Sequence, residues 1–146
     1  MDVLQSLANG FATALTLKNL YLAFIGCLWG TVVGVLPGIG PVAGITLLIP
    51  ATYGLDATGA IIMLAGIYYG AMYGGSTTSI LMNIPGESAS VITCLDGYQM
   101  ARKGRGGAAL FIAAFGSWVG GKLGIIGLML MAPLLADFAP DRKRVL

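Results

Sequence analysis

The chain contains no histidine and few charges: eight basic and six acidic residues among 146. Histidine is the commonest general base and metal ligand, so its absence removes Ser-His-Asp, Cys-His and His-Glu-x-x-His active sites. An ordinary soluble domain carries about 25% charged residues, whereas this chain carries 10%. The basic residues are also too scattered for a nucleic-acid-binding stripe. The composition therefore indicates neither an enzyme nor a nucleic-acid-binding protein.

Cysteine is scarce as well, since Cys27 and Cys94 are the only two. Two cysteines cannot form the disulfide framework of a small secreted domain, and no metal site is expected. The N-terminus lacks the positive region and small-residue cleavage site of a signal peptide. Residues 1–18 are instead expected to form an amphipathic helix at the membrane surface. Its apolar face would consist of Val3, Leu4, Leu7, Phe11 and Leu15.

Long uncharged runs are the dominant feature of this sequence. The chain is 57% hydrophobic, and its mean hydropathy is +0.87. Lys18, Asp56 and Glu87 bound two uncharged runs, and Lys122 is the only charge between residues 106 and 136. About 20 helical residues cross the hydrocarbon core of a bilayer. The pattern predicts an all-α integral membrane protein, folded as a polytopic helical bundle with broken helices.

Proline and glycine divide the first uncharged run. Residues 19–36 are expected to form the first span, and Val42 to Ile49 a shorter helix. Between them, the sequence Pro-Gly-Ile-Gly-Pro at 37–41 cannot continue a helix, because proline lacks an N–H and clashes one turn back. Unpaired backbone at membrane depth is tolerated where it lines a wet cavity. The break therefore either forms part of a binding site or is an interfacial turn between two ordinary helices.

A Gly-Gly pair and a Pro-Gly pair divide the second run. Residues 57–73 predict a span near the lower length limit, and the glycines at 74–75 are expected to end it. The segments on either side of the Pro-Gly pair at 85–86 are too short to cross the membrane. This pattern predicts a re-entrant hairpin over residues 74–95, in which two half-helices enter and leave on the same side.

Residues 96–106 form a polar stretch and predict a loop. Its basic residues place this loop on the cytoplasmic side by the positive-inside rule: Arg102, Lys103 and Arg105. The last span is expected within residues 107–136. Lys122 lies near its middle, where a charge costs about 2.5–3.5 kcal/mol, so its side chain should face a cavity, a carboxylate or a partner chain.

Glycine recurs at every fourth residue in each predicted span. The three series are Gly26, Gly30 and Gly34; Gly66, Gly70 and Gly74; and Gly116, Gly120 and Gly124. Such a strip lets a neighbouring backbone approach closely where lipid supplies no hydrophobic driving force. The strips predict a tightly packed bundle.

Hydroxyl and amide side chains cluster at Ser76–Ser79 and Asn83. A helix starting there would present free N–H groups and a positive dipole end to a carboxylate, as the broken helices of transporters do. Alternatively, the hydroxyls bond to the backbone of their own helix. Glu87 is either a proton carrier or cation ligand, or, as we favour, the cap of the following helix.

Three sequence blocks resemble the large membrane subunit of the tripartite tricarboxylate transporters, the TctA family. They are LPGIGP, YYGAMYGGSTTSILMNIPGE and LDGYQMARKGRGG, all within Gly34 to Leu110. Weaker similarity extends the likeness from Met1 to about Pro140. The resemblance implies a permease of the bacterial inner membrane that takes up tricarboxylates or related carboxylates, driven by Na+ or H+. It also implies three partners: a periplasmic solute-binding protein, a small membrane subunit and a second, related half of the permease.

By the same resemblance, substrate-binding residues are expected at the family's signature positions: Gly38, Gly40, Ser76, Thr77, Asn83, Pro85 and Gly86. Residues 19–140 would then be the first half of a two-repeat permease domain, and residues 141–146 a tail outside the family. This tail and Lys122 depart from the family's pattern and suggest a truncated or split gene product. The alternative function is a non-transporting membrane fragment, or a small oligomeric membrane protein held together by its glycine strips.

Overall fold

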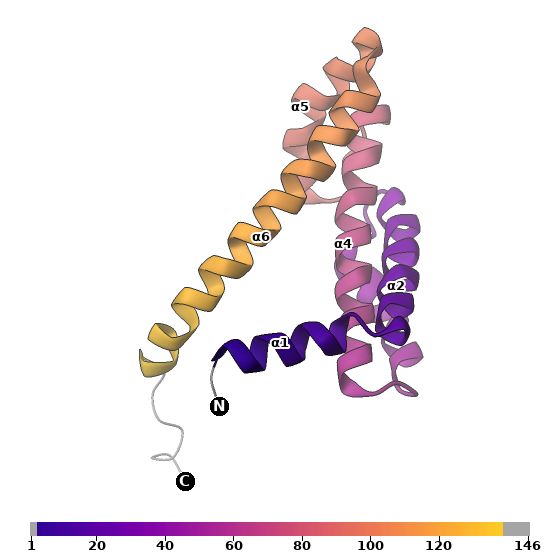
Figure 1. Cartoon of the computed structure of the whole chain (residues 1–146). Helices are drawn as coiled ribbons and strands as arrows, with labels where there is room; N and C mark the ends of the chain where they lie inside the picture. The colour runs from indigo at the N-terminus through magenta and orange to yellow at the C-terminus, as the bar shows by residue number, and fades with distance from the viewer. Residues whose placement is uncertain (1–2, 139–146) are drawn as a thin grey trace. The chain divides into compact units, whose positions relative to one another are not determined.

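The structure, a computed structural model, describes residues 3–138, which form helices joined by short turns, with no β-strand in that range (Figure 1). The predicted tail at 141–146 lies outside the described residues. The chain divides into two compact units, residues 1–110 and 111–146. In order, the elements are α1 (Val3–Ala14), α2 (Leu17–Val35), α3 (Gly40–Leu48), a 3₁₀ turn η1 (Ile49–Thr52), α4 (Ala57–Met82), a 3₁₀ turn η2 (Ser88–Ser90), α5 (Val91–Met100), a wide turn η3 (Ala101–Arg105) and α6 (Gly106–Phe138).

Three helical runs are long and apolar enough to cross a membrane: Leu17–Val35, Ala57–Met82 and Ser88–Met131. Large apolar side chains on these runs and on α3 face outward, as Phe24, Leu47 and Ile92 do with 64%, 73% and 75% of their surface exposed. Soluble proteins rarely expose so much contiguous apolar surface. The predicted fold class is therefore confirmed: this is an all-α membrane protein.

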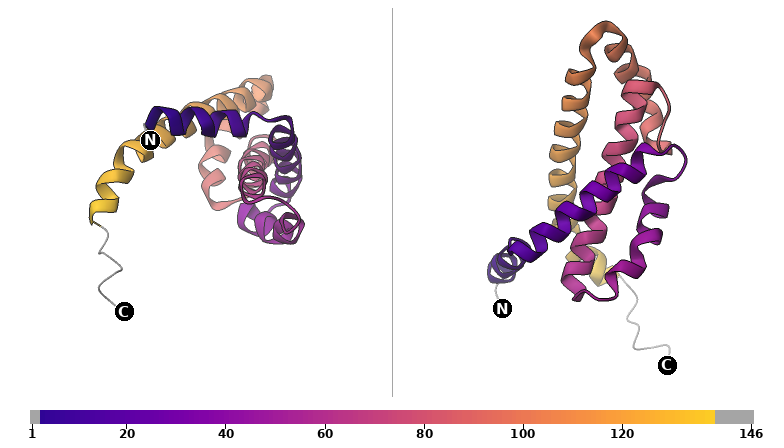
Figure 2. Two further views of the ribbon diagram at one scale, coloured as in Figure 1. Left: turned by 60° about the horizontal axis from the view of Figure 1, so that its bottom comes forward. Right: turned by 90° about the vertical axis from the view of Figure 1, so that its right-hand side faces the viewer.

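Two of the three predicted glycine strips pack against each other. The strips of α2 and α4 face one another. The two helices lie side by side in Figure 1, and α2 crosses in front of α4 in the right-hand view of Figure 2. A Cβ added at Gly30 would lie 2.1 Å from the Ile67 carbonyl oxygen, and one at Gly70 would lie 2.1 Å from the Cys27 carbonyl oxygen. Backbone meets backbone here, so no side chain fits at either position.

The first predicted break and its flanking helices are confirmed. α2 ends at Val35, and the short α3 turns back to pack on α2 and α4, with Gly44 against Val33. Gly38 and Gly40 have φ angles of 84° and 66°. Glycine adopts these left-handed angles without the steric cost that other residues incur.

The predicted helix end at the 74–75 glycine pair is wrong, because α4 continues without interruption to Met82. Each glycine of the pair meets a different neighbour. A Cβ at Gly74 would lie 2.4 Å from the Thr31 carbonyl oxygen on α2, whereas Gly75 faces Gly86 and Glu87. Two helical glycines cost roughly 1 kcal/mol each in propensity, and this close packing offsets that cost.

The predicted re-entrant pair of half-helices is consequently not formed, since its first half is the end of α4. Asn83 ends α4 in a left-handed conformation (φ 58°, ψ 29°). The chain then returns along α4 through residues 84–87, until Gly86 reaches Gly75. From there α5 packs on the last part of α4, where a Cβ at Gly97 would meet the Ile80 side chain at 2.7 Å.

The predicted polar loop at 96–106 is also largely helical. Asp96 to Met100 belong to α5, and the reversal into α6 is confined to Ala101–Arg105, where Gly104 has a φ of 76°. Glycine at this one position is enough to reverse the chain, so no longer loop is needed.

The N-terminal ends of α2 and α4 are held together by an ion pair between Lys18 and Asp56. Asp56 also caps α4 by accepting a hydrogen bond from the Gly59 N–H at 3.0 Å. The hydrogen bond from Lys18, and secondly that from Gly59, hold the pKa of the Asp56 carboxyl below its usual range. Beside them, the buried Asn19 side chain donates to the Thr13 carbonyl at 2.8 Å and so ties α1 to α2.

α6 has 33 residues, and it carries two opposite faces between Phe111 and Gly124. One is aromatic: Phe111, Phe115 and Trp118 stack in succession, with centroids 6.1 and 5.9 Å apart, and the Lys122 Nζ lies 3.6 Å from the Trp118 ring centroid. At 3.6 residues per turn, the third glycine strip lies on the other face. A Cβ added at Gly116, Gly120 or Gly124 would meet no atom within 4 Å in the described part of the chain.

Candidate functional site

The two broken segments of the sequence, near residues 38 and 86, meet in space. The Gly38 N–H donates a hydrogen bond to the Gly86 carbonyl oxygen at 3.3 Å. Gly86 is buried where α2 and α4 touch, and a Cβ there would lie 2.5 Å from the Gly75 Cα and 2.7 Å from the Gly34 carbonyl oxygen. The absence of a side chain at Gly86 thus allows the two segments to join.

A cavity of about 510 Å³ opens along this junction. Its lining comes from both segments: Gly38, Ile39, Gly40, Pro41 and Val42 from the first, and Pro85, Gly86, Glu87, Ser88 and Val91 from the second. This volume lies within the 300–1,000 Å³ that is usual for small-ligand sites.

Two helix N-termini border the cavity. α3 starts at Gly40, and the helical run that starts at Ser88 continues directly into α5. The first N–H groups of a helix have no carbonyl partner within the helix, and the end carries about half a positive charge. Small anions such as carboxylates are stabilised in this position.

Glu87 supplies the only ionisable side chain in the lining of the cavity. It is half-buried and forms a capping box with Ser90. The Glu87 side chain accepts from the Ser90 backbone N–H, while the Glu87 N–H donates to the Ser90 Oγ at 3.3 Å. The capping role that we favoured for Glu87 is confirmed. Within residues 3–138, no group of three His, Cys, Asp or Glu side chains is suited to hold a metal ion.

The predicted site residues divide into two groups. Gly38, Gly40, Pro85 and Gly86 line the cavity, whereas Ser76, Thr77 and Asn83 do not. The helix start expected at Ser76 is wrong, because Ser76 lies within α4. Its hydroxyl donates to the Met72 carbonyl at 3.0 Å, and that of Thr77 donates to the Tyr73 carbonyl at 2.9 Å. The alternative of bonding within the helix is therefore correct.

Asn83 has a conformational role in this structure. Its side chain is exposed, and its left-handed backbone ends α4, a conformation that asparagine tolerates better than most residues. Ser88, by contrast, lines the cavity and was missed as a site residue. Its signal was present, since a hydroxyl residue directly after a turn is a common helix start.

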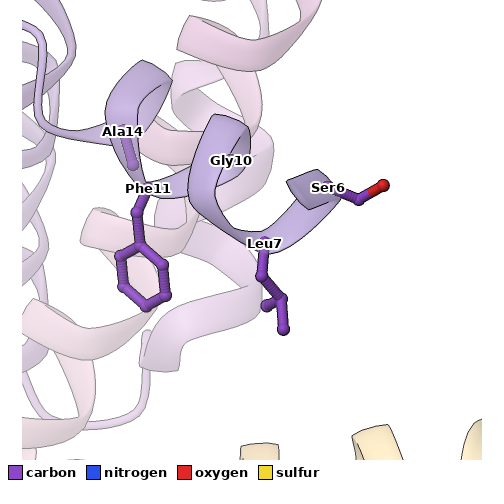
Figure 3. Close-up of a pocket in the computed structure, with 5 residues that line it drawn as sticks. All are labelled: Ser6, Leu7, Gly10, Phe11 and Ala14. Carbon is purple, nitrogen blue, oxygen red and sulfur yellow. The ribbon is translucent and has the colours of Figure 1, made fainter. Parts of the chain in front are cut away.

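A second cavity, of about 400 Å³, runs along α1 and is lined by Ser6, Leu7, Gly10, Phe11 and Ala14. Leu7 and Phe11 point to the same side of the helix and Ser6 points away (Figure 3). The amphipathic pattern is thus present in the described side chains; those of Val3 and Leu4 lie outside them. Because its lining lies along one helix rather than at the starts of two, this groove is the weaker candidate for a carboxylate site.

The model of the tripartite tricarboxylate transporter TctA family matches residues 20–143. An uncharacterized 52.8 kDa protein from the TAR-I ttuC′ 3′ region of Agrobacterium vitis is 55% identical over 95% of this chain. An uncharacterized protein of Methanocaldococcus jannaschii is 30% identical over 82% of it. The chain spans 28% and 30% of the lengths of these relatives. No solved structure matches it. The family match includes residues 141–143, the first half of the predicted tail.

Proposed function

Because this chain belongs to the tripartite tricarboxylate transporter TctA family, we propose that it is the N-terminal part of a permease subunit that carries tricarboxylates or related carboxylates across the membrane. Transport is driven by a cation gradient, of Na+ or H+. The family's description is that of a transporter, and the three long apolar helices support a membrane-embedded role.

The observation that carries this proposal is the convergence of two helix N-termini on one cavity. α3 and the helical run that includes α5 both begin there, and the positive ends of two helices suit carboxylate oxygens. Secondary transporters bind anionic groups at the N-termini of broken helices in this manner. The substrate therefore contacts backbone N–H groups near Gly40 and Ser88 rather than a basic side chain.

The partners follow from the family rather than from the geometry. We infer a periplasmic solute-binding protein that delivers the carboxylate, and a small membrane subunit that completes the transporter. The location is the bacterial inner membrane, with several crossings. A second, related half of the permease would close the side of the cavity that this chain leaves open.

Isothermal titration of the detergent-solubilised chain with citrate tests the proposed site. Ser88→Asp places a carboxylate in the cavity, at a helix start where it favours the fold. It should weaken citrate binding at least tenfold. Ser88→Asn, which has nearly the same size and no charge, is the matched control and should bind as the unmodified chain does. Equal citrate affinity in both variants would show that the carboxylate site lies elsewhere.

A further inference from the structure

We propose that Glu87 is the coupling residue of this permease: its carboxylate must be neutralised by a cation, H+ or Na+, before a carboxylate ligand occupies the cavity. This inference rests on the proposed function and assigns its cation dependence to one side chain. It follows from three features of the cavity.

The first feature is the position of Glu87 within the cavity. Its carboxylate belongs to the same lining as the start of α3 and the start of the helical run into α5. An incoming carboxylate attracted by these helix starts would therefore lie within a few ångströms of a negative charge. Two unit charges at about 6 Å, with an effective dielectric constant of about 20, weaken binding about a hundredfold.

The second feature is that no other charged group can offset this repulsion. Glu87 is alone among ionisable side chains in the cavity lining. Among the packed elements, α3 carries no ionisable group, and the charge of α2, Lys18, is paired with Asp56 at the opposite end of that helix. The ionisable groups of α4 are three tyrosines near its middle, Tyr68, Tyr69 and Tyr73. On α5, the exposed Asp96 lies more than two helical turns beyond Glu87.

The third feature is the capping box. The Glu87 side chain accepts the Ser90 N–H, one of the donors at the helix start that borders the cavity. The Glu87 carboxylate thus occupies part of the site that an external carboxylate needs. A cation bound to Glu87 removes its negative charge, so the ligand can take over the attraction of the two helix starts.

Citrate titration of the detergent-solubilised chain tests this, with Glu87→Gln as the variant. Glutamine has nearly the same size as glutamate and keeps a carbonyl oxygen that can accept a hydrogen bond, so the acceptor at the helix start is retained while the charge is removed. One series raises Na+ against choline at a fixed alkaline pH, where citrate is fully ionised. The other lowers the pH without Na+, and the comparison of the two proteins at each pH cancels the titration of citrate itself.

For the unmodified chain, we expect citrate affinity to rise at least tenfold with Na+, with H+ or with both, and the responsive series identifies the coupling ion. Glu87→Gln should bind citrate tightly without added cation and respond at most twofold. Asp96→Asn, which removes an exposed carboxylate outside the cavity, should keep the full cation response. Circular dichroism of all three proteins checks that they remain helical.

The outcomes separate this inference from the proposed function. A Glu87→Gln variant with the cation response of the unmodified chain overturns the role of Glu87 and leaves the carboxylate site standing. If the unmodified chain binds citrate equally well at every Na+ concentration and pH, the role of Glu87 is likewise overturned and the carboxylate site still stands. If the unmodified chain binds no citrate under any condition, both proposals fail together.

Discussion

Single residues without a side chain determine where the candidate site forms. Gly38 needs its left-handed φ of 84°, and no atom would block a Cβ there. Gly86 needs space instead, since a Cβ would lie 2.5 Å from the Gly75 Cα. The same residue type thus serves conformation at one position and close packing at the other. Together the two glycines allow the Gly38–Gly86 hydrogen bond that joins the walls of the cavity.

The ion pair between Lys18 and Asp56 predicts a pH dependence at the residue scale. The lowered pKa of Asp56 means that the pair stabilises the fold above the unfolded-state pKa of about 3.9. This contribution is lost as the pH falls through the lower, folded-state pKa. Asp56→Asn keeps a good helix cap and should lower the midpoint of thermal unfolding at neutral pH, measured by circular dichroism in detergent.

Below the folded-state pKa of Asp56, the unmodified chain and Asp56→Asn should unfold at the same temperature. Asp96→Asn is the control for the loss of an exposed carboxylate without a helix-cap role. A difference between the two unfolding midpoints that is equally large at acidic and neutral pH would contradict a role for the Lys18 pair.

At the scale of elements, most helices could be predicted from the sequence, because their signals are local. Runs of apolar residues and the prolines near residue 37 were enough to predict α2, α3 and the start of α4 close to their observed bounds. The end of α4 was not predictable in this way. Gly74 and Gly75 resemble a helix break, yet Gly74 packs against Thr31 on α2 and Gly75 against Gly86, beyond the end of α4. A partner that is remote in sequence leaves no local signal.

Replacing a strip glycine by alanine should change the stability of the chain in opposite directions on α6 and α2. Alanine favours a helix over glycine by about 1 kcal/mol, so Gly120→Ala on α6, which meets no atom within 4 Å, should stabilise the chain slightly. Gly30→Ala would place its Cβ 2.1 Å from the Ile67 carbonyl oxygen. It should destabilise the chain by about 3 kcal/mol, since overpacking forces the helices apart.

Unfolding of both glycine variants in detergent by added sodium dodecyl sulfate, followed by circular dichroism, measures this difference. Destabilisation by Gly120→Ala as well would indicate that the α6 strip is already packed, for example against another copy of the chain. That outcome would favour the oligomeric alternative, in which glycine strips hold several copies together.

At the scale of the molecule, two groups of charges within residues 3–110 lie near opposite ends of α4. The Lys18–Asp56 pair lies at the start of α4. The turn that contains Arg102, Lys103 and Arg105 leads into Gly106. A Cβ added at Gly106 would lie 3.5 Å from Leu81, near the end of α4. With 26 residues, α4 is about 39 Å long, more than the roughly 30 Å hydrocarbon core. The two ends should therefore lie on opposite sides of the membrane.

Cysteine labelling tests this topology. In a background in which Cys27 and Cys94 are replaced by alanine, a membrane-impermeant maleimide should label Gly54→Cys in intact spheroplasts. Lys103→Cys should react only in inverted vesicles, because basic turns remain on the cytoplasmic side. Labelling of both positions from the same side would rule out α4 as a membrane-crossing helix.

The sequence by itself determined that this is a membrane protein of helices, where the first break lies and which glycines form strips, because hydropathy and proline act over a few residues. Only the tertiary structure decided which strips pair, that α4 continues past Gly75, and that Ser76 and Thr77 satisfy their hydroxyls within it. It also brought Gly38, Gly86 and Glu87 around one cavity. These outcomes depend on contacts between segments far apart in the chain, where close approach of backbones outweighs local preference.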